Sequence, residues 1–277
     1  MALKVLIRRL RDYPEFEQLL HIQREVWKHT DVNLTPTHQF CVHSRMGAIV
    51  LGAFVDGTLA GFIYSFPALL DGIHTQHSHL LAVLPEFQGL GIGKKLKWAQ
   101  RREVLEQGIG LITWTYDPMQ ARNAHLNLHS LGARSRTYFS NFYGSVPSLG
   151  LGPGIPTDRL LVEWRIGDGE VVSRSRSGKT KPTLRADRIS AALERAAGTG
   201  DGFPMPAPPR LGLKDKTVLV EVPPNVMSLL GRPDLIAAWQ AGLRRVMRSY
   251  FKRGYAAEGF LSGERSFYVL KQEKKNR

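Results

Sequence analysis

The sequence has a single cysteine, Cys41, and no long apolar run among its 277 residues. One cysteine excludes an internal disulfide, which is typical of proteins in a reducing compartment. The longest apolar stretches, such as residues 80–84, are far shorter than the roughly 20 apolar residues that span a bilayer. Residues 1–10 lack the apolar core and cleavage site of a signal peptide, and their alternation of basic and apolar side chains predicts a strand. We therefore expect a cytoplasmic protein that does not bind a membrane.

Metal-ligand patterns are also missing. His74, His77 and His79 lie close together in the sequence, but they have neither the spacing nor the partner ligands of a metal site. We therefore expect no bound metal.

Acidic residues are few compared with basic ones. The chain has 24 Asp and Glu against 38 Lys and Arg, a formal charge of +14, and residues 216–277 hold 12 basic residues against 5 acidic ones. A basic surface attracts nucleic acid, but it attracts the phosphates of CoA and anionic substrates equally. Because the basic residues are not interleaved with aromatic ones in a nucleic-acid motif, we do not expect a nucleic-acid partner.

Hydrophobic periodicity predicts alternating strands and helices over residues 1–166. Asp12 and Glu15 form the pattern of a reciprocal capping box at the start of the first helix. Asp56 and Gly57 predict a tight hairpin turn, because both residues tolerate a positive φ. We expect strands at 3–9, 48–55, 59–66, 77–84, 111–116, 134–139 and 159–166, and helices from 12, from 35 to about 44, at 93–107 and at 121–131.

The composition changes after this region. Residues 167–215 are basic and proline-rich, which predicts a linker or surface excursion with one short helix near 187–197. Residues 216–277 predict a β-α-β-β extension, whose helix carries Leu235, Trp239, Val246 and Tyr250 on one apolar stripe. We therefore divide the chain into 1–166, 167–215 and 216–277.

The most informative stretch is residues 78–94, in which a strand leads through a glycine-rich loop into a helix. Gly89, Gly91 and Gly93 have no Cβ, so a pyrophosphate can approach the backbone. The first amides of the helix have no acceptor and lie at the positive end of its dipole, so they are ready donors for phosphate oxygens. Neither the pattern of a Rossmann dinucleotide loop nor that of a P-loop is present.

This stretch resembles the cofactor loop of the GNAT superfamily of N-acetyltransferases, which reads Q/R-x-x-G-x-G/A after a strand ending in x-V-x-P. The matching residues are Gln88, Gly91 and Gly93, preceded by 82–85. The resemblance covers roughly residues 1–166. The runs at 114–125, 156–159 and 163–164 look like those of a bacterial subgroup with an extended C-terminus. The resemblance implies an α/β fold of the α+β type, with a mixed, mostly antiparallel twisted sheet flanked by helices and followed by the β-α-β-β extension.

The resemblance also implies a site for an acyl-CoA. The strand residues Leu81, Ala82 and Val83 should pair with the pantetheine arm, and the loop and first helical turn should hold the pyrophosphate. Asn123 lies near the position of a family asparagine. The implied cofactor residues of the loop are Gln88, Gly89, Leu90, Gly91, Ile92, Gly93 and Lys94.

The chain departs from the family at the acid that protonates the leaving thiolate. Counting back from Gly132 places Leu128, which cannot donate a proton, where many members carry a tyrosine. The nearby candidates for the acid are His129, Tyr138 and Tyr143, and Asn127 could serve only as an orienting donor. His79, on the strand that presents the thioester, is the candidate base, because imidazole has an ordinary pKa near 6.5.

The sequence therefore predicts an N-acyltransferase that moves an acetyl group, or another short acyl group, from acyl-CoA to the amine of a small molecule such as an amino acid. One alternative is an N-succinyltransferase that acts on amino acids, because some relatives are linked to that reaction. Another is a catalytically silent acyl-CoA-binding protein, which the leucine at position 128 would suit. The sequence leaves a homodimer open.

Overall fold

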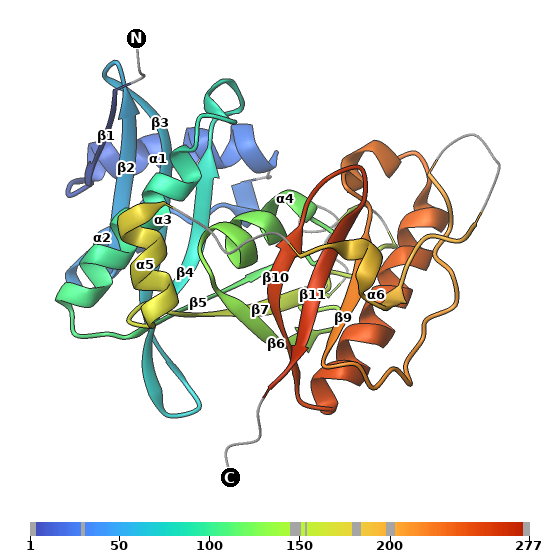
Figure 1. The fold of residues 1–277 in the computed structure, drawn as a ribbon. Helices are drawn as coiled ribbons and strands as arrows, with labels where there is room; N and C mark the ends of the chain where they lie inside the picture. The colour runs from blue at the N-terminus through green and yellow to red at the C-terminus, as the bar shows by residue number, and fades with distance from the viewer. Residues whose placement is uncertain are drawn as a thin grey trace. The chain divides into compact units, whose positions relative to one another are not determined.

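The computed structural model describes residues 4–28, 31–144, 151–152, 154–178, 184–197 and 203–273. The chain forms two compact units (Figure 1). The N-terminal unit is Met1–Trp114 with Arg165–Asp168, and the C-terminal unit is Thr115–Trp164 with Gly169–Arg277. Our division at residues 166 and 215 stays a prediction. Among the described residues, no helix is both long and apolar enough to cross a membrane.

The sheet of the N-terminal unit has the order β1-β2-β3-β4-β5. Its strands are β1 (Val5–Arg9), β2 (Ile49–Val55), β3 (Thr58–Leu70), β4 (Ile73–Val83) and β5 (Leu111–Tyr116). The first four pair antiparallel, and β4 pairs with β5 in parallel. Asp56 and Gly57 have φ angles of 47° and 84° between β2 and β3, so the predicted hairpin turn is confirmed.

Helices cover both faces of this sheet. The helices α1 (Tyr13–Trp27) and α2 (Thr37–Arg45) lie on one face, and α3 (Ile92–Glu106) packs on the other. The buried apolar cluster on the α1 and α2 face comprises Leu10, Phe16, Leu19, Ile22, Phe40, Ala48, Val50, Leu59, Phe62, Tyr64, Ala82 and Leu84. This cluster accounts for the apolar stripe of the first helix.

Asp12 and Glu15 cap the start of α1, and Glu15 also has partners outside the predicted capping box. The Asp12 carboxylate accepts the Glu15 amide at 3.1 Å, as expected. The Glu15 carboxylate accepts the backbone amide of Arg11 at 2.7 Å and also interacts with the backbone amide of Asp12. It also accepts a side-chain hydrogen bond from Arg8, so Glu15 is drawn toward the end of β1.

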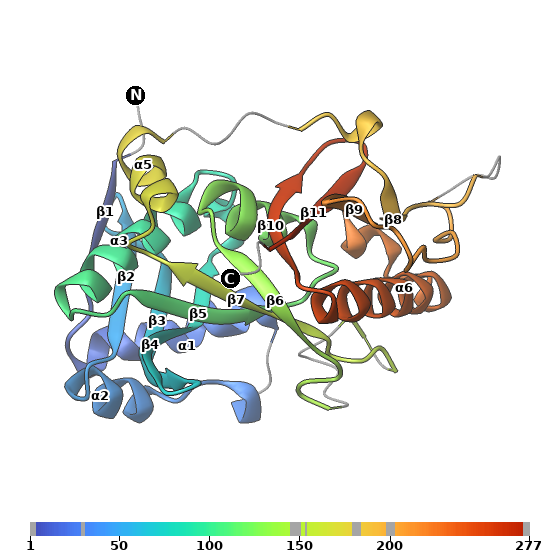
Figure 2. The ribbon, with the colours of Figure 1, turned by 60° about the horizontal axis from the view of Figure 1, so that its bottom comes forward.

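The sheet of the C-terminal unit has the order β7-β6-β10-β11-β9-β8 (Figure 2). Its strands are β6 (Arg134–Phe139), β7 (Arg159–Arg165), β8 (Ala191–Leu193), β9 (Thr217–Val222), β10 (Tyr255–Leu261) and β11 (Ser266–Gln272). All neighbouring pairs for which the register is defined are antiparallel except β8 and β9. The helix α6 (Pro233–Lys252) packs on these strands with Trp239, Val246 and Tyr250 fully buried, so the predicted β-α-β-β extension is confirmed.

One predicted helix is present with a different winding, and a second predicted helix was wrong. Residues 121–131 form a short α4 (Ala121–Ala124) that continues as the π-helix η3 (His125–Ser130), in which the Leu131 amide reaches the Leu126 carbonyl at 2.9 Å. The wider π turn adds a residue, so counting back four from Gly132 no longer identifies the residue on a given face. The helix near 187–197 is instead a 3₁₀ turn, Ala186–Arg188, followed by β8, because a short apolar run suits a buried strand as well as a helix.

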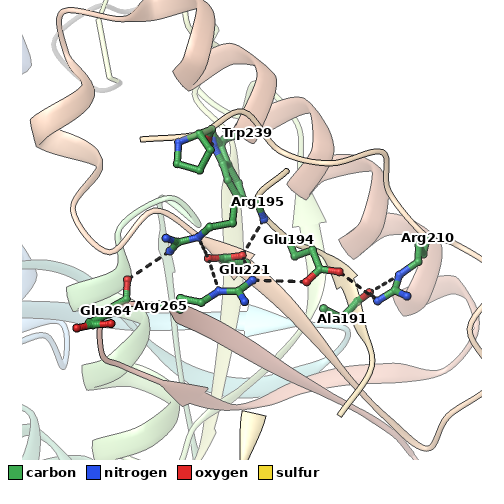
Figure 3. Close-up of polar contacts among 9 residues, drawn as sticks. Ala191, Glu194, Arg195, Arg210, Glu221, Trp239, Glu264 and Arg265 are labelled. Atoms are coloured by element: carbon green, nitrogen blue, oxygen red, sulfur yellow. Dashed lines mark hydrogen bonds and ion pairs between the residues drawn. The ribbon is translucent and has the colours of Figure 1, made fainter. Parts of the chain in front are cut away.

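The described parts of residues 167–215 include α5 (Gly169–Ser177) and β8, and a buried carboxylate holds this segment on the sheet. Glu221 of β9 is fully buried and accepts the Arg195 backbone amide at 2.8 Å and its Nε at 2.7 Å (Figure 3). Arg265 donates its Nε to the same carboxylate at 3.0 Å. Burial alone would raise the pKa of Glu221, but the hydrogen bonds from Arg265 and Arg195 hold it below its usual range.

Arg174 of α5 caps the π-helix. Its guanidinium donates to the His129 carbonyl and to Glu170, and the side chain is only 7% exposed. Gly132, at φ 74°, makes room for it, because a Cβ at that position would lie 3.0 Å from the Arg174 Nε. A helix from the proline-rich segment therefore satisfies a free carbonyl at the end of η3.

Candidate active site

The C-terminal half of β4 has one open edge. β4 pairs with β3 along its whole length, but among the described residues its pairing with β5 is limited to Gln76 with Ile112 and His77 with Thr113. Residues 78–83 therefore have backbone groups on the β5 side without a strand partner. Such an edge is available for pairing with an extended ligand. It contains Leu81, Ala82 and Val83, the residues that we expected along the pantetheine arm.

A β-bulge at His79 shapes this strand. Tyr64 of β3 pairs with Leu80 and Ser65 pairs with Ser78, so His79 is the extra residue of the ladder. A bulge bends its strand and redirects side chains, and bulges are common beside active sites. The bulge brings the His79 ring next to those of Tyr64 and Phe66, at 5.9 and 5.7 Å between centroids.

The glycine loop follows β4 and opens α3. Gly89 and Gly91 have φ angles of 83° and 73°, and no atom lies within 4 Å of a Cβ placed on either residue. The Lys95 amide donates to the Gly91 carbonyl at 3.0 Å, which leaves the amides of Ile92 to Lys94 without an acceptor inside the helix. The expected cofactor loop therefore combines open space with several free donors.

Two contacts hold the loop on β4. The Gln88 side-chain Nε2 donates to the Val83 carbonyl at 3.1 Å. A Cβ on Gly93 would contact the Leu81 side chain at 3.9 Å, so the first turn of α3 lies close to the strand. The loop residues Gln88 to Lys94 and the strand residues Leu81 to Val83 are thus brought together, as the sequence predicted.

Five rings form one cluster at the bulge. They are the imidazoles of His43, His77 and His79 and the rings of Tyr64 and Phe66. His77 is 6.5 Å from His79 between centroids, and the His43 Nδ1 of α2 is hydrogen-bonded to the Tyr64 hydroxyl. His79 is solvent-exposed, but the rings packed around it partly desolvate the imidazole, and this desolvation, and then the nearby His43, lowers the pKa of His79. The imidazole is therefore neutral at neutral pH and can accept a proton. Tyr64, whose pKa burial raises to about 12, stays protonated.

Sequence reasoning missed His43 and Tyr64 as neighbours of this site. Tyr64 was part of an apolar strand and His43 part of a short helix, and neither position carries a motif. Their approach to His79 depends on the bulge, which the alternation of residues in β4 does not reveal.

The remaining predicted site residues lie in the C-terminal unit. Asn123 is exposed on α4, and His129 of η3 stacks on His125 at 4.7 Å between centroids. Tyr143 is 37% exposed, and its ring lies 5.0 Å from the Arg159 guanidinium. Leu128 is fully buried. The roles of Asn123, His129 and Tyr143 stay predictions.

Comparison with known families accounts for the strand, loop and helix. The model of the acetyltransferase (GNAT) family matches residues 11–132. The chain carries a GNAT acetyltransferase domain. The GNAT domain makes the protein an acyltransferase that uses an acyl-CoA, and the mixed sheet with flanking helices that we expected is confirmed. Among the described residues, no group of three or more His, Cys, Asp or Glu could hold a metal ion.

Solved structures with a similar fold are distant in sequence. The ribosomal-protein-S18-alanine N-acetyltransferase of Escherichia coli is 18% identical over 60% of this chain and 96% of its own, with a TM-score of 0.48. The ribosomal-protein-alanine N-acetyltransferase of Brucella melitensis is 21% identical over 57% and 98%, with a TM-score of 0.48. The protein yncA of Salmonella typhimurium, solved with its cofactor acetyl-CoA, is 19% identical over 60% and 95%, with a TM-score of 0.49. A sequence comparison with curated proteins gave no match.

Proposed function

We propose that the protein transfers an acetyl group from acetyl-CoA to the amine of a small molecule. The observation that carries this proposal is the open edge of β4, which ends in a loop whose free amides and open space suit a pyrophosphate. The family assignment gives the enzyme class, and the acceptor and the acyl group are the parts that we add. We also propose that the protein is cytoplasmic. We propose no oligomeric state.

The chain's own residues suggest a division of tasks. The amides at the start of α3 and the Lys94 ammonium would hold the pyrophosphate, and the β4 edge would align the pantetheine arm. Acetyl-CoA, when bound, supplies the acyl group as a thioester. His79 would accept the proton that the amine loses, because its lowered pKa keeps the ring neutral. His129 and Tyr143 stay the candidates that the sequence predicts for the acid.

The acceptor is proposed as a small amine such as an amino acid. The N-succinyl alternative has no support from the comparisons, so acetyl is the acyl group proposed. The catalytically silent alternative rests on the sequence count that places Leu128, a fully buried leucine, at the acid position, and the π turn of η3 weakens that count. It is distinguished by turnover: cofactor binding without acetylation of any amine in a broad panel would favour the silent protein.

Calorimetric titration with acetyl-CoA, succinyl-CoA and free CoA tests the cofactor site. The informative variant is Gly91→Glu, which places a carboxylate where the phosphates would lie. Its matched control is Gly108→Glu at the other end of α3, because Gly108 has nearly the same φ, 74°, and equally open surroundings. Both variants carry the same backbone strain and the same charge change.

We expect wild type and Gly108→Glu to bind acetyl-CoA, and Gly91→Glu to lose binding while keeping a cooperative melting transition. Failure of wild type to bind any CoA species would overturn the proposal. Equal loss in both glycine variants would show that strain, and not phosphate exclusion, caused the effect. Tighter binding of succinyl-CoA than of acetyl-CoA would replace the proposed acyl group.

A further inference from the structure

The C-terminal unit contains a cavity whose wall includes none of the residues of the proposed cofactor loop. It lies between η3, α5 and the strands β10 and β11, and its volume is about 90 Å³. This is well above the roughly 10–15 Å³ that one water needs. The residues that line it are Leu128, His129, Arg174, Leu184, Glu258, Gly259, Phe260, Leu261, Val269 and Lys271.

A second β-bulge opens the strand side of this cavity. Ala257 pairs with Leu270 and Gly259 pairs with Val269, so Glu258 is the extra residue of β10. The bulge gives Glu258 a place in the cavity wall next to Gly259. Gly259 adds no side chain there, and a Cβ at that position would already lie 3.4 Å from the Val269 side chain. Because residue 259 is a glycine, the space beside the Glu258 carboxylate stays open.

The cavity carries two opposite charges that no residue in the described part of the chain pairs. Glu258 and Lys271 both line it and are half-buried. Neither side chain forms an ion pair or hydrogen bond with any residue that the structure describes. Arg174 differs, because it is bound to Glu170 and to the His129 carbonyl. Partly buried charges without partners are unfavourable, so both groups are available to a ligand.

The rest of the wall is apolar. Leu128 comes from η3, Phe260 and Leu261 from β10, and Val269 from β11. An occupant must therefore combine a cation, an anion and a small apolar portion. A ligand with only one charge would leave either Glu258 or Lys271 unpaired.

We propose that this cavity binds a small zwitterion, namely a free amino acid with an apolar side chain. Its ammonium would pair with Glu258, its carboxylate with Lys271, and its side chain would contact Leu128 and Phe260. The proposal concerns binding by the C-terminal unit, so it does not depend on acyl transfer or on the cofactor loop.

The test is calorimetric titration of the full chain with alanine and valine, and with propionate and ethylamine, which each lack one of the two charges. We expect an amino acid to bind and both singly charged analogues to bind at least tenfold more weakly, about 1.4 kcal/mol. Glu258→Gln and Lys271→Met should each weaken amino-acid binding by a similar factor. Glu264→Gln and Lys252→Met are matched controls, because both residues are exposed and neither lines the cavity.

Melting curves separate loss of binding from loss of fold. Removing an unpaired charge should leave the melting temperature unchanged or raised. No saturation by any amino acid up to about 10 mM, in a protein that melts cooperatively, would overturn the proposal. Equal binding of amino acid and singly charged analogues would also overturn it. Amino-acid binding that persists in Gly91→Glu would show that the site is independent of acetyl-CoA.

Discussion

Arg244 of α6 binds both carboxylate oxygens of Asp158, with its Nε at 2.8 Å and its Nη2 at 3.0 Å. Asp158 is fully buried, and the Tyr138 hydroxyl donates to the same carboxylate at 2.6 Å. The pair therefore ties the helix of the C-terminal extension to the loop before β7. It also accounts for Tyr138, which is held as a donor to Asp158 and is not available as a catalytic acid.

Replacing Asp158 by Ala should strongly destabilise the protein. The change leaves the Arg244 guanidinium partly buried without its carboxylate, and removing one member of a buried pair costs about 3–5 kcal/mol. Urea unfolding measures the loss. The control is Asp234→Ala, which breaks the exposed pair with Arg232 at the start of the same helix and should leave the midpoint nearly unchanged. Equal effects of the two changes would contradict this explanation.

Replacing Lys97 by Met should stabilise the protein. Lys97 is 2% exposed, with its Nζ 2.9 Å from the Ser78 hydroxyl and 3.6 Å from the centre of the Trp114 ring. Burial lowers the pKa of Lys97 well below its usual range, so the native state disfavours the charged ammonium that the unfolded chain carries. Methionine has a similar length and no charge, and Gln100 still donates to Ser78 at 3.0 Å.

The pH dependence of the unfolding free energy tests whether removal of the buried ammonium causes the stabilisation in Lys97→Met. Because the folded pKa of the lysine is lowered, wild type loses stability as pH falls from about 10 toward the folded pKa. The advantage of the variant should therefore be larger at pH 7 than at pH 10. A constant difference across this range would instead indicate a packing effect.

The stability of the N-terminal unit should fall as the solution is acidified below pH 6.5. Burial, with His79 and Lys97 nearby, lowers the pKa of His77 from 6.5 to about 4. The unfolded chain therefore binds a proton in this range before the folded chain does, which costs at most about 3 kcal/mol by pH 4. The half-buried position of His77 reduces this figure.

The measurement is the difference between wild type and His77→Phe in urea unfolding from pH 4 to pH 7. Phenylalanine keeps the contact with Phe66 but cannot titrate. Subtracting the two unfolding free energies cancels the contributions of all other titrating groups. One of these is Asp117, whose pKa burial raises to about 6, so that its contribution to stability is lost as pH rises through that value. A difference that does not change with pH would exclude His77 as the titrating group.

If the proposed transfer reaction is correct, His79→Asn should lower kcat by about 10²–10⁴-fold. The KM for acetyl-CoA should change little, because the cofactor contacts lie in the loop and on the backbone of β4. The acidic limb of the pH profile should disappear with the imidazole. His74→Asn is the matched control, because His74 is exposed on the same strand and outside the ring cluster. Equal activity of the two variants would remove His79 from the mechanism.

The parts of the fold that depend on local signals could be predicted from the sequence. Asp56 and Gly57 identified a hairpin, and Gly89 to Gly93 identified a tight loop that opens a helix, because turns and helix starts depend on neighbouring residues. The bulges at His79 and Glu258 could not be predicted, because each depends on how two strands align along their length. The π turn in η3 was missed for a related reason, since its one extra residue leaves the helical pattern almost unchanged.

The cavity was beyond sequence reasoning because its walls come from separate parts of the chain. Leu128, Arg174 and Lys271 lie far apart in the sequence, and none belongs to a ligand-binding motif. Arg174 was part of a stretch that we interpreted as a linker on composition alone. Composition reports that a segment cannot fold by itself, but it does not report what the segment covers.

The packing of the Arg174 side chain against Gly132 has an evolutionary consequence. Any side chain at position 132 would meet the guanidinium, and loss of the arginine would leave the His129 carbonyl without its donor. A substitution at position 132 therefore affects position 174, and the reverse. Gly132 ends a helix of the acetyltransferase domain, whereas Arg174 lies in the basic segment after it. Among descendants of a common ancestor, α5 and the glycine after η3 should be inherited or lost as a pair.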